Sequence, residues 1–256
     1  MKKSLIFIAL IAFSLSTYAQ VSYLQYRAVP SDKEDEFVEK ETKYWSKVAK
    51  AAANQGQLAG WSLWRKVGVT KIDAPNYVFV NSYESLDKMD PSKVWSDANI
   101  KTMGMDPAKV ETASFTTVPF DYWMQLEAVI PGDYKYAIVN YAKPNDRQAF
   151  IEENKTLWKP MHEKNIKNGT MGMTSWGLMS VIYPAGNQDR FSVFTWDGFQ
   201  TMTDALKFLR YSSPNSDEQS GDWAEVMSIT KMDEILPDGF EYRIIYERVM
   251  SVGPDN

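Results

Sequence analysis

Two glutamates are the residues of this sequence best suited by type and spacing to acid–base chemistry. Glu127 and Glu247 are 120 residues apart, and each stands among apolar residues. A carboxylate on a buried strand is desolvated, which raises its pKa toward neutrality, as a general acid or base requires. The alternative is a solvated position or an ion pair with Arg243 or Arg248, because structural ion pairs resemble functional sites.

His162 is the only histidine of the chain and a third catalytic candidate. It follows Trp158 by four residues in a segment with helical periodicity, so a partly exposed helix position is the simpler interpretation. A zinc site of the usual kind needs more nitrogen or sulfur ligands than one histidine and no cysteine provide. The sequence therefore predicts no metal site.

Aromatic side chains supply the material for a ligand pocket. They make up 14% of the chain, with nine Trp and fourteen Tyr. A large apolar cavity with a few polar groups is the usual form of a small-molecule site, and plain core packing is the alternative for each single residue. The candidate ligand-binding residues are Tyr26, Trp64, Arg65, Tyr83, Trp123, Tyr141, Trp176, Trp196 and Arg243.

Charge and missing motifs exclude several functions. The chain has 28 basic and 33 acidic residues and no basic cluster, which argues against nucleic acid or an anionic membrane as partner. The absence of cysteine excludes thiol chemistry and disulfides. Neither a phosphate-binding glycine loop nor a GxSxG turn is present. The oligomeric state is not indicated by the sequence.

The first nineteen residues have the pattern of a signal peptide. Lys2 and Lys3 precede an apolar run from Leu5 to Phe13, and Thr17 and Ala19 offer the small residues that a signal peptidase reads. Such a run is too short to cross a hydrocarbon core of about 30 Å. We therefore expect cleavage after Ala19 and a periplasmic or secreted protein without a membrane anchor.

The remaining chain contains an internal repeat. A shift of 113 residues aligns Tyr23 with Tyr136, Phe37 with Phe150, Glu39 with Glu152, Trp45 with Trp158 and Gly56 with Gly169. Near the ends, Phe120-Asp-Tyr122 matches Phe240-Glu-Tyr242 at a shift of 120. Rare residues that match at one register indicate a duplicated unit.

Each copy is predicted to have the element order β-α-β-β-α-β. Expected strands are 21–29, 61–67, 77–83 and 122–130, then 136–141, 174–183, 191–196 and 242–250. Expected helices are 31–54, with a capping box at Ser31 and Glu34, a broken helix at 91–109, a helix at 145–167 kinked at Pro160, and one from Thr203. The organisation is therefore a signal peptide (1–19), a first ferredoxin-like unit (20–130), a linker (131–134) and a second unit (135–256).

The predicted strands are apolar or aromatic on both faces, so both faces of each sheet should be buried. Trp61 and Leu63 alternate with Trp64, for example. Helices cover one face of a ferredoxin-like sheet, and the sheet of the other copy is the simplest cover for the second. The fold class is thus α+β, with two tandem repeats packed sheet to sheet.

This arrangement resembles the dimeric α/β-barrel superfamily in a fused tandem form. The resemblance spans about residues 21 to 251 and depends on element order, the repeat, and the segments Trp45…Gly56…Trp61-Ser-Leu63 and Trp158…His162…Gly169…Trp176-Gly-Leu178. It is a likeness of fold and carries no function by itself. Haem-binding members use a helix histidine as axial ligand, so the resemblance implies a haem alternative at His162; no cofactor is otherwise predicted.

Three functions remain open. The first is an exported module that binds a small apolar or aromatic molecule between the sheets. The second is an enzyme, either a cofactor-independent oxygenase or isomerase using Glu127 and Glu247, or a haem protein. The third is an interaction protein without a pocket. A cavity lined by aromatics without inward carboxylates favours the first.

Overall fold

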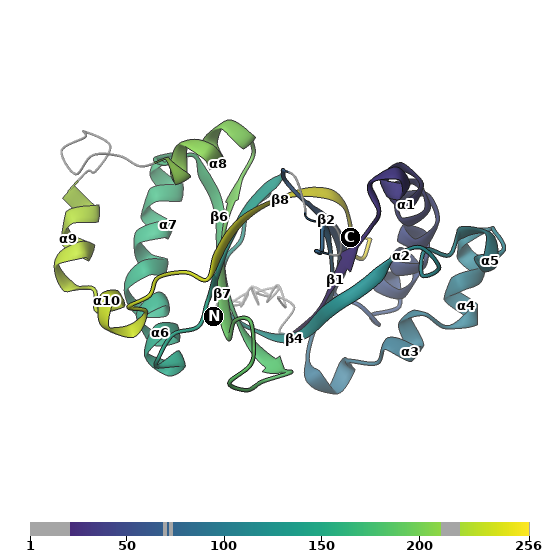
Figure 1. Ribbon diagram of the computed structural model, residues 1–256, viewed down its shortest axis with the longest axis horizontal. Helices are drawn as coiled ribbons and strands as arrows, with labels where there is room; N and C mark the ends of the chain where they lie inside the picture. Colours follow the sequence, from purple (N-terminus) through teal and green to yellow (C-terminus); the bar gives the residue numbers. More distant parts are fainter. Residues whose placement is uncertain (1–20, 69–70, 72–73, 211–220, 256) are drawn as a thin grey trace, which may run out of the picture.

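The computed structural model describes residues 21–68, 71, 74–210 and 221–255. Eight strands form a closed barrel in the order β1-β3-β2-β8-β5-β7-β6-β4, and neighbouring strands are antiparallel throughout. Helices α1 to α5 flank one side of the barrel and α6 to α10 the opposite side (Figure 1). The predicted signal peptide and its cleavage site lie outside the described residues.

The first half contributes four strands and five α-helices. They are β1 (Val21–Ala28), α1 (Glu34–Lys40), α2 (Ser46–Asn54), β2 (Gly60–Lys66), β3 (Tyr77–Tyr83), α3 (Pro91–Val94), α4 (Asp97–Ile100), α5 (Pro107–Val110) and β4 (Thr117–Ile130). Short 3-10 turns cover Ser31–Lys33, Leu86–Lys88 and Lys101–Met103. The broken helix expected at 91–109 is confirmed, since Asp90 and Asp106 cap two separate helices that begin with proline.

The second half has the same strand and main-helix order. It comprises β5 (Tyr136–Ala142), α6 (Arg147–Glu153), α7 (Lys159–Asn168), β6 (Met173–Tyr183), β7 (Val193–Phe199), α8 (Met202–Leu209), α9 (Gly221–Ile229), α10 (Met232–Ile235) and β8 (Tyr242–Val252). The halves close the barrel through two antiparallel junctions, β2 with β8 and β4 with β6.

A π-helical turn interrupts the long helix in each half. The turns cover Glu41–Trp45 and Asn154–Trp158, which are 113 residues apart, the shift of the sequence repeat. Pro160 follows the second turn at the start of α7, whereas no proline follows the first. The π-helical interruption is therefore a feature that the long helices of both halves share, and it is not caused by the proline alone.

The capping box predicted at Ser31 is wrong. The side chain of Ser31 caps nothing, because the helix is preceded by a 3-10 turn. Glu34 instead accepts hydrogen bonds from Asn76 Nδ2 (3.2 Å) and from the hydroxyl of Tyr77 (2.9 Å). The carboxylate thus fastens the start of α1 to β3.

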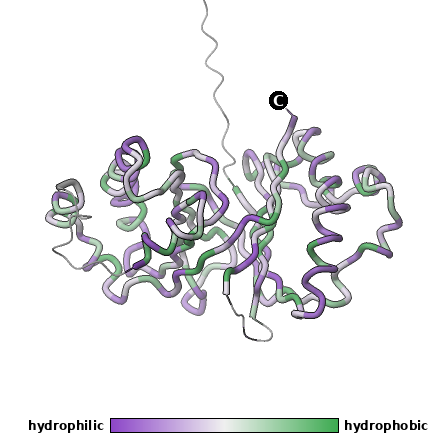
Figure 2. Tube along the Cα trace, turned by 90° about the horizontal axis from the view of Figure 1, so that it is seen from above, coloured by the Kyte–Doolittle hydropathy of each residue, from purple (hydrophilic) through white to green (hydrophobic). Residues whose placement is uncertain are grey.

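Both faces of the barrel wall are packed, as the two-sided apolar pattern predicts. On the outer face, Trp61 and Leu63 pack under α2, and Trp176 and Leu178 pack under the helices of the second half. On the inner face a separate cluster around Leu24, Tyr26, Met124, Tyr141 and Tyr246 fills part of the lumen. Hydrophobic and hydrophilic stretches alternate along the helices of both lobes, as expected of helices that bury one face (Figure 2).

Candidate functional site

The lumen of the barrel contains a cavity of about 310 Å³. It is lined by residues of all eight strands and by Tyr134, which lies between β4 and β5. These residues are Ser22, Leu24, Tyr26, Ser62, Trp64, Val78, Val80, Ser82, Leu126, Val129, Tyr134, Ala137, Val139, Tyr141, Met179, Phe194, Trp196 and Tyr246. Val80, Val139 and Leu126 remain partly accessible although they face inward, because the lumen is not packed solid at this level.

Packed aromatic rings close the lumen beyond this cavity. Tyr26 packs on Phe120 with ring centroids 4.6 Å apart, and Phe191 packs on Tyr122 (4.5 Å) and Tyr141 (4.7 Å). Such ring pairs add stability beyond their buried area. The cavity therefore has an aromatic floor at this level of the barrel.

Two tryptophans and Tyr134 form the aromatic wall of the cavity. Trp64 stacks on Tyr134 with centroids 5.5 Å apart, and its indole N–H donates to Ser62 Oγ at 2.8 Å. The indole of Trp196 crosses β6 at Gly177, where any Cβ would lie 1.9 Å from the ring. Its N–H makes no hydrogen bond of normal geometry and interacts only weakly with the Tyr134 hydroxyl.

Three tyrosine hydroxyls form a chain at the floor of the cavity. The hydroxyls of Tyr26 and Tyr141 are 3.0 Å apart, and Tyr141 donates to Tyr246 at 3.2 Å. Burial raises the pKa of Tyr246 to about 12 and raises the pKa of Tyr26 and Tyr141 well above the ordinary value. All three therefore stay neutral near pH 7 and can act as hydrogen-bond donors but not as strong bases.

The cavity offers neutral polar groups only. Among the described residues that line it, none is a carboxylate, histidine, lysine or arginine. Its polar atoms are the tyrosine hydroxyls, the two indole N–H groups and a group of serines, in which Ser22 Oγ lies 3.1 Å from Ser82 Oγ. Such a lining suits an uncharged, mainly apolar guest.

The structure brings four of the predicted ligand-binding residues together in the lumen: Tyr26, Trp64, Tyr141 and Trp196. Three other aromatics of that set lie on the outer face. Tyr83 packs under the first-half helices, Trp123 stacks on Tyr23 (4.4 Å), and Trp176 packs under the second-half helices. They belong to the helix–sheet cores, because their strand positions have the opposite parity.

Arg65 and Arg243 also face outward. Arg65 pairs with Glu247 at 2.8 Å, and Arg243 donates from Nε to Asn140 Oδ1 at 2.8 Å. Placing either arginine in the intersheet cavity was therefore wrong.

The two glutamates lie on opposite sides of the barrel, also on its outer face. Glu127 accepts from Lys155 Nζ (2.9 Å) and Ser180 Oγ (2.7 Å). Glu247 pairs with Arg65 and with Lys135 (3.1 Å), and the hydrogen bond from Arg65 lowers its pKa. Strands β4 and β8 are separated by three strands on either path round the barrel. The ion-pair interpretation therefore describes both residues, with partners other than Arg243 and Arg248.

His162 lies on α7 and packs against the outer face of the sheet. It is 7% exposed and stacks on Trp176 with centroids 5.5 Å apart. Its Nδ1 has no hydrogen-bond partner among the described residues, and burial lowers its pKa to about 4. The tryptophan covers one ring face, and His162 lines neither the lumen cavity nor the outer groove, so these residues do not fit a haem.

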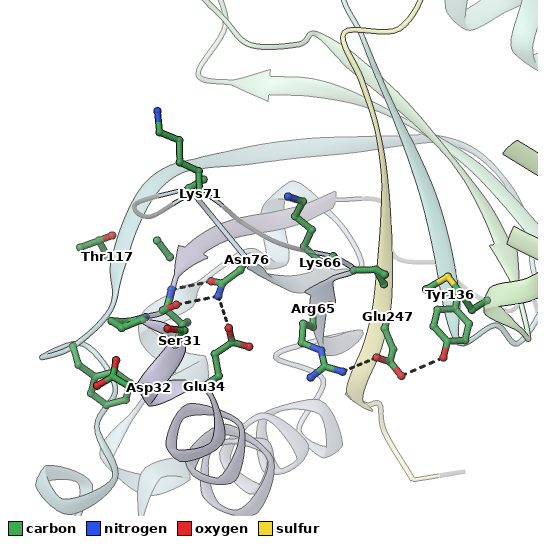
Figure 3. A pocket seen from close by; sticks show the side chains of 18 residues that line it. Ser31, Asp32, Glu34, Arg65, Lys66, Lys71, Asn76, Thr117, Tyr136 and Glu247 are labelled. Carbon is green, nitrogen blue, oxygen red and sulfur yellow. Dashed lines mark hydrogen bonds and ion pairs between the residues drawn. The ribbon is translucent and has the colours of Figure 1, made fainter. Parts of the chain in front are cut away.

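A larger groove of about 860 Å³ lies outside the barrel, between the start of α1 and the β2–β8 junction. Figure 3 shows Arg65, Glu247 and Tyr136 linked along one wall, and Asn76 linked to Glu34 on the other. Arg65 and Glu247 neutralise one another there, whereas Glu34 is bound by the neutral side chains of Asn76 and Tyr77. The charged side chains of this lining make the groove a solvated junction between the halves and a poor site for an apolar guest.

Two buried carboxylates, those of Glu41 and Asp197, were not predicted from the sequence. Glu41 is 6% exposed and accepts from Thr112 Oγ1 (2.8 Å), and burial raises its pKa to about 7. Asp197 accepts from Asn140 Nδ2 (2.8 Å), and burial raises its pKa to about 6. Both lie between sheet and helices, away from the lumen. The available signal for Glu41 was its position on the apolar stripe with Phe37 and Val48.

No helix in the described part of the chain is long and apolar enough to cross a membrane. No group of three or more His, Asp or Glu residues here could bind a metal ion.

No family model and no curated protein matches the chain. Solved structures do. A monooxygenase-like protein of Fusobacterium nucleatum is similar over 92% of this chain and 95% of its own, at 11% identity and a TM-score of 0.56. An anthrone oxidase-like protein is similar over 93% and 95%, at 12% and 0.55. A chlorite dismutase variant of Candidatus Nitrospira defluvii is similar over 90% of each chain, at 10% and 0.50. At these identities the likeness shows the fold alone, and that fold is the dimeric α/β barrel.

Proposed function

We propose that this protein binds a small, uncharged, mainly apolar or aromatic molecule in the lumen of its barrel. The observation that carries the proposal is the 310 Å³ cavity, which is lined by Trp64, Trp196 and four tyrosines and by no charged side chain among the described residues. Burying an apolar guest there removes roughly 25 cal/mol of unfavourable hydration for each Å² of its surface. The neutral hydroxyls and the indole N–H of Trp196 supply orientation.

An enzymatic role in the lumen has weaker support. The structural neighbours include monooxygenase-like and anthrone oxidase-like proteins, which keeps a cofactor-independent oxygenase or isomerase as the second candidate. Proton abstraction from a bound substrate needs a base whose pKa is near the working pH. The described lining offers only tyrosines whose pKa burial has raised, and Glu127 and Glu247 face away from it.

We further propose that the two halves are fused copies of one unit, a pseudo-dimer, and that the chain is exported. The matched π-helical turns 113 residues apart support the first point. The basic and apolar N-terminal pattern supports the second. N-terminal sequencing of the protein from its own host should begin at Gln20; an intact Met1 on a cytoplasmic protein would refute export.

The binding proposal is tested first on protein purified from its own host. Native mass spectrometry should detect a bound small molecule that is released on denaturation. An absorbance spectrum of the same sample tests the haem alternative, and no haem band is expected. A titration of the empty protein with 2-ethylnaphthalene, followed by tryptophan fluorescence, should saturate at one site. Failure of both the native sample and the titration to show a ligand would refute the proposal.

A further inference from the structure

The direction of the tyrosine chain leaves one donor unused. Because Tyr141 donates its proton to Tyr246, Tyr26 must donate to Tyr141. The proton of Tyr246 is then the last in the chain, and it has no acceptor among the described residues. Tyr246 is only 5% exposed and lines the cavity, so this donor is unsatisfied in a buried place.

An unsatisfied buried donor lowers the stability of the protein, and its position indicates which ligand group should accept its hydrogen bond. Leaving a buried O–H without an acceptor destabilises a protein. The two hydroxyls behind Tyr246 polarise it and strengthen the bond that it can donate. The described lining has no positive charge to balance an anionic guest. A neutral acceptor such as a carbonyl oxygen meets both conditions.

We propose that the lumen ligand is an uncharged apolar molecule with a carbonyl oxygen, which accepts a hydrogen bond from Tyr246 at the end of the Tyr26–Tyr141–Tyr246 chain. This inference rests on the proposed function. The apolar body of the ligand lies against Val139, Trp196 and the other apolar lining residues. The three linked tyrosines lie on β1 of the first half and on β5 and β8 of the second half, so the site exists only in the closed barrel.

The test compares two probes of nearly equal shape, 2-acetonaphthone and 2-ethylnaphthalene. Affinities are measured by tryptophan fluorescence on the whole mature chain and corrected for the transfer of each probe from water to hydrocarbon. Tyr246→Phe should weaken the binding of 2-acetonaphthone by roughly three- to tenfold, which is the contribution of one hydrogen bond. The affinity for 2-ethylnaphthalene should stay within twofold of wild type. Tyr136→Phe is the matched control, because that hydroxyl lies on the outer face and donates to Glu247.

A second measurement needs no variant. The carbonyl stretch of bound 2-acetonaphthone, read by infrared difference spectroscopy on the wild-type protein, should shift to lower frequency than in hexane. If both probes bind but Tyr246→Phe affects them equally and the stretch matches hexane, this inference is overturned while the proposed function stands, with water as the acceptor of Tyr246. If neither probe binds, this inference is overturned, and the proposed function fails with it when protein from its own host also carries no ligand.

Discussion

Trp196 lies directly across Gly177, so closely that a Cβ at position 177 would approach the indole ring to 1.9 Å. The pair is cross-strand, between β7 and β6, on the lumen side of the wall. Glycine is needed here for close approach rather than for its backbone freedom. This one residue allows a large ring to lie flat along the wall and leaves the cavity open beside it.

Gly177→Ala should therefore push Trp196 into the lumen. We expect a loss of about 1–3 kcal/mol of unfolding free energy, as for other overpacked sites, and weaker binding of 2-ethylnaphthalene. Guanidinium unfolding and probe titration measure the two effects. Gly186→Ala is the control, because a Cβ there would meet nothing within 4 Å. Equal stability of the two variants would contradict the packing described for Trp196.

His162 should make the protein sensitive to acid. Burial lowers its folded pKa to about 4 from 6.5, so the unfolded chain takes up this proton first as the pH falls. The stability that the neutral imidazole contributes is fully present above pH 6.5. Roughly 3 kcal/mol of unfolding free energy is lost as the pH falls from 6.5 to 4. His162→Phe keeps an aromatic ring beside Trp176 and should lose less stability over that range. Parallel pH profiles of unfolding for variant and wild type would show that the imidazole is not buried as described.

Glu41 should have the opposite effect. Its folded pKa is raised to about 7 from 4.5, so the folded state takes up this proton first and becomes more stable as the pH falls from 7 to 4.5. Glu41→Gln should have a higher free energy of unfolding than wild type at pH 8. This difference should shrink by on the order of 3 kcal/mol between pH 8 and pH 4.5. Glu39→Gln, on the exposed face of the same helix, should show no such trend. A pH-independent difference for Glu41→Gln would mean that its carboxyl is solvated.

Removal of the charge of either outer glutamate should not affect ligand binding in the lumen. Glu127→Gln and Glu247→Gln should each bind 2-ethylnaphthalene within twofold of wild type, because both carboxylates lie outside the barrel wall in ion pairs. The same titration at pH 5 and pH 8 should agree for all three proteins. A tenfold change in either variant would return the glutamates to the functional site.

The sequence predicts the element order well because a pattern that recurs along the chain and two-sided apolar strands leave few arrangements. The face of each residue is harder to predict. Trp61 and Trp64 lie on the same strand, one under α2 and one in the lumen, and their chemistry is identical. Alternation separates the two sets but does not say which set faces inward when both are apolar. For this reason Trp176 was placed in the cavity and Tyr246 was left out.

Ion pairing was equally hidden in the sequence. The partner of Glu247 is Arg65, 182 residues away on a strand that becomes its neighbour only when the barrel closes. Glu127 finds Lys155 on the π-helical turn of the second half. Nearby charges in the sequence, such as Arg248, therefore gave the wrong partners.

The most direct test of the lumen as a ligand site is to fill it. Val139 lines the cavity, whereas Val118 is 41% exposed on β4 and lies outside the lining. Titration of both phenylalanine variants with 2-ethylnaphthalene should show at least tenfold weaker binding for Val139→Phe and unchanged binding for Val118→Phe, with both proteins folded by circular dichroism. Wild-type affinity in folded Val139→Phe would place the ligand elsewhere and contradict the account.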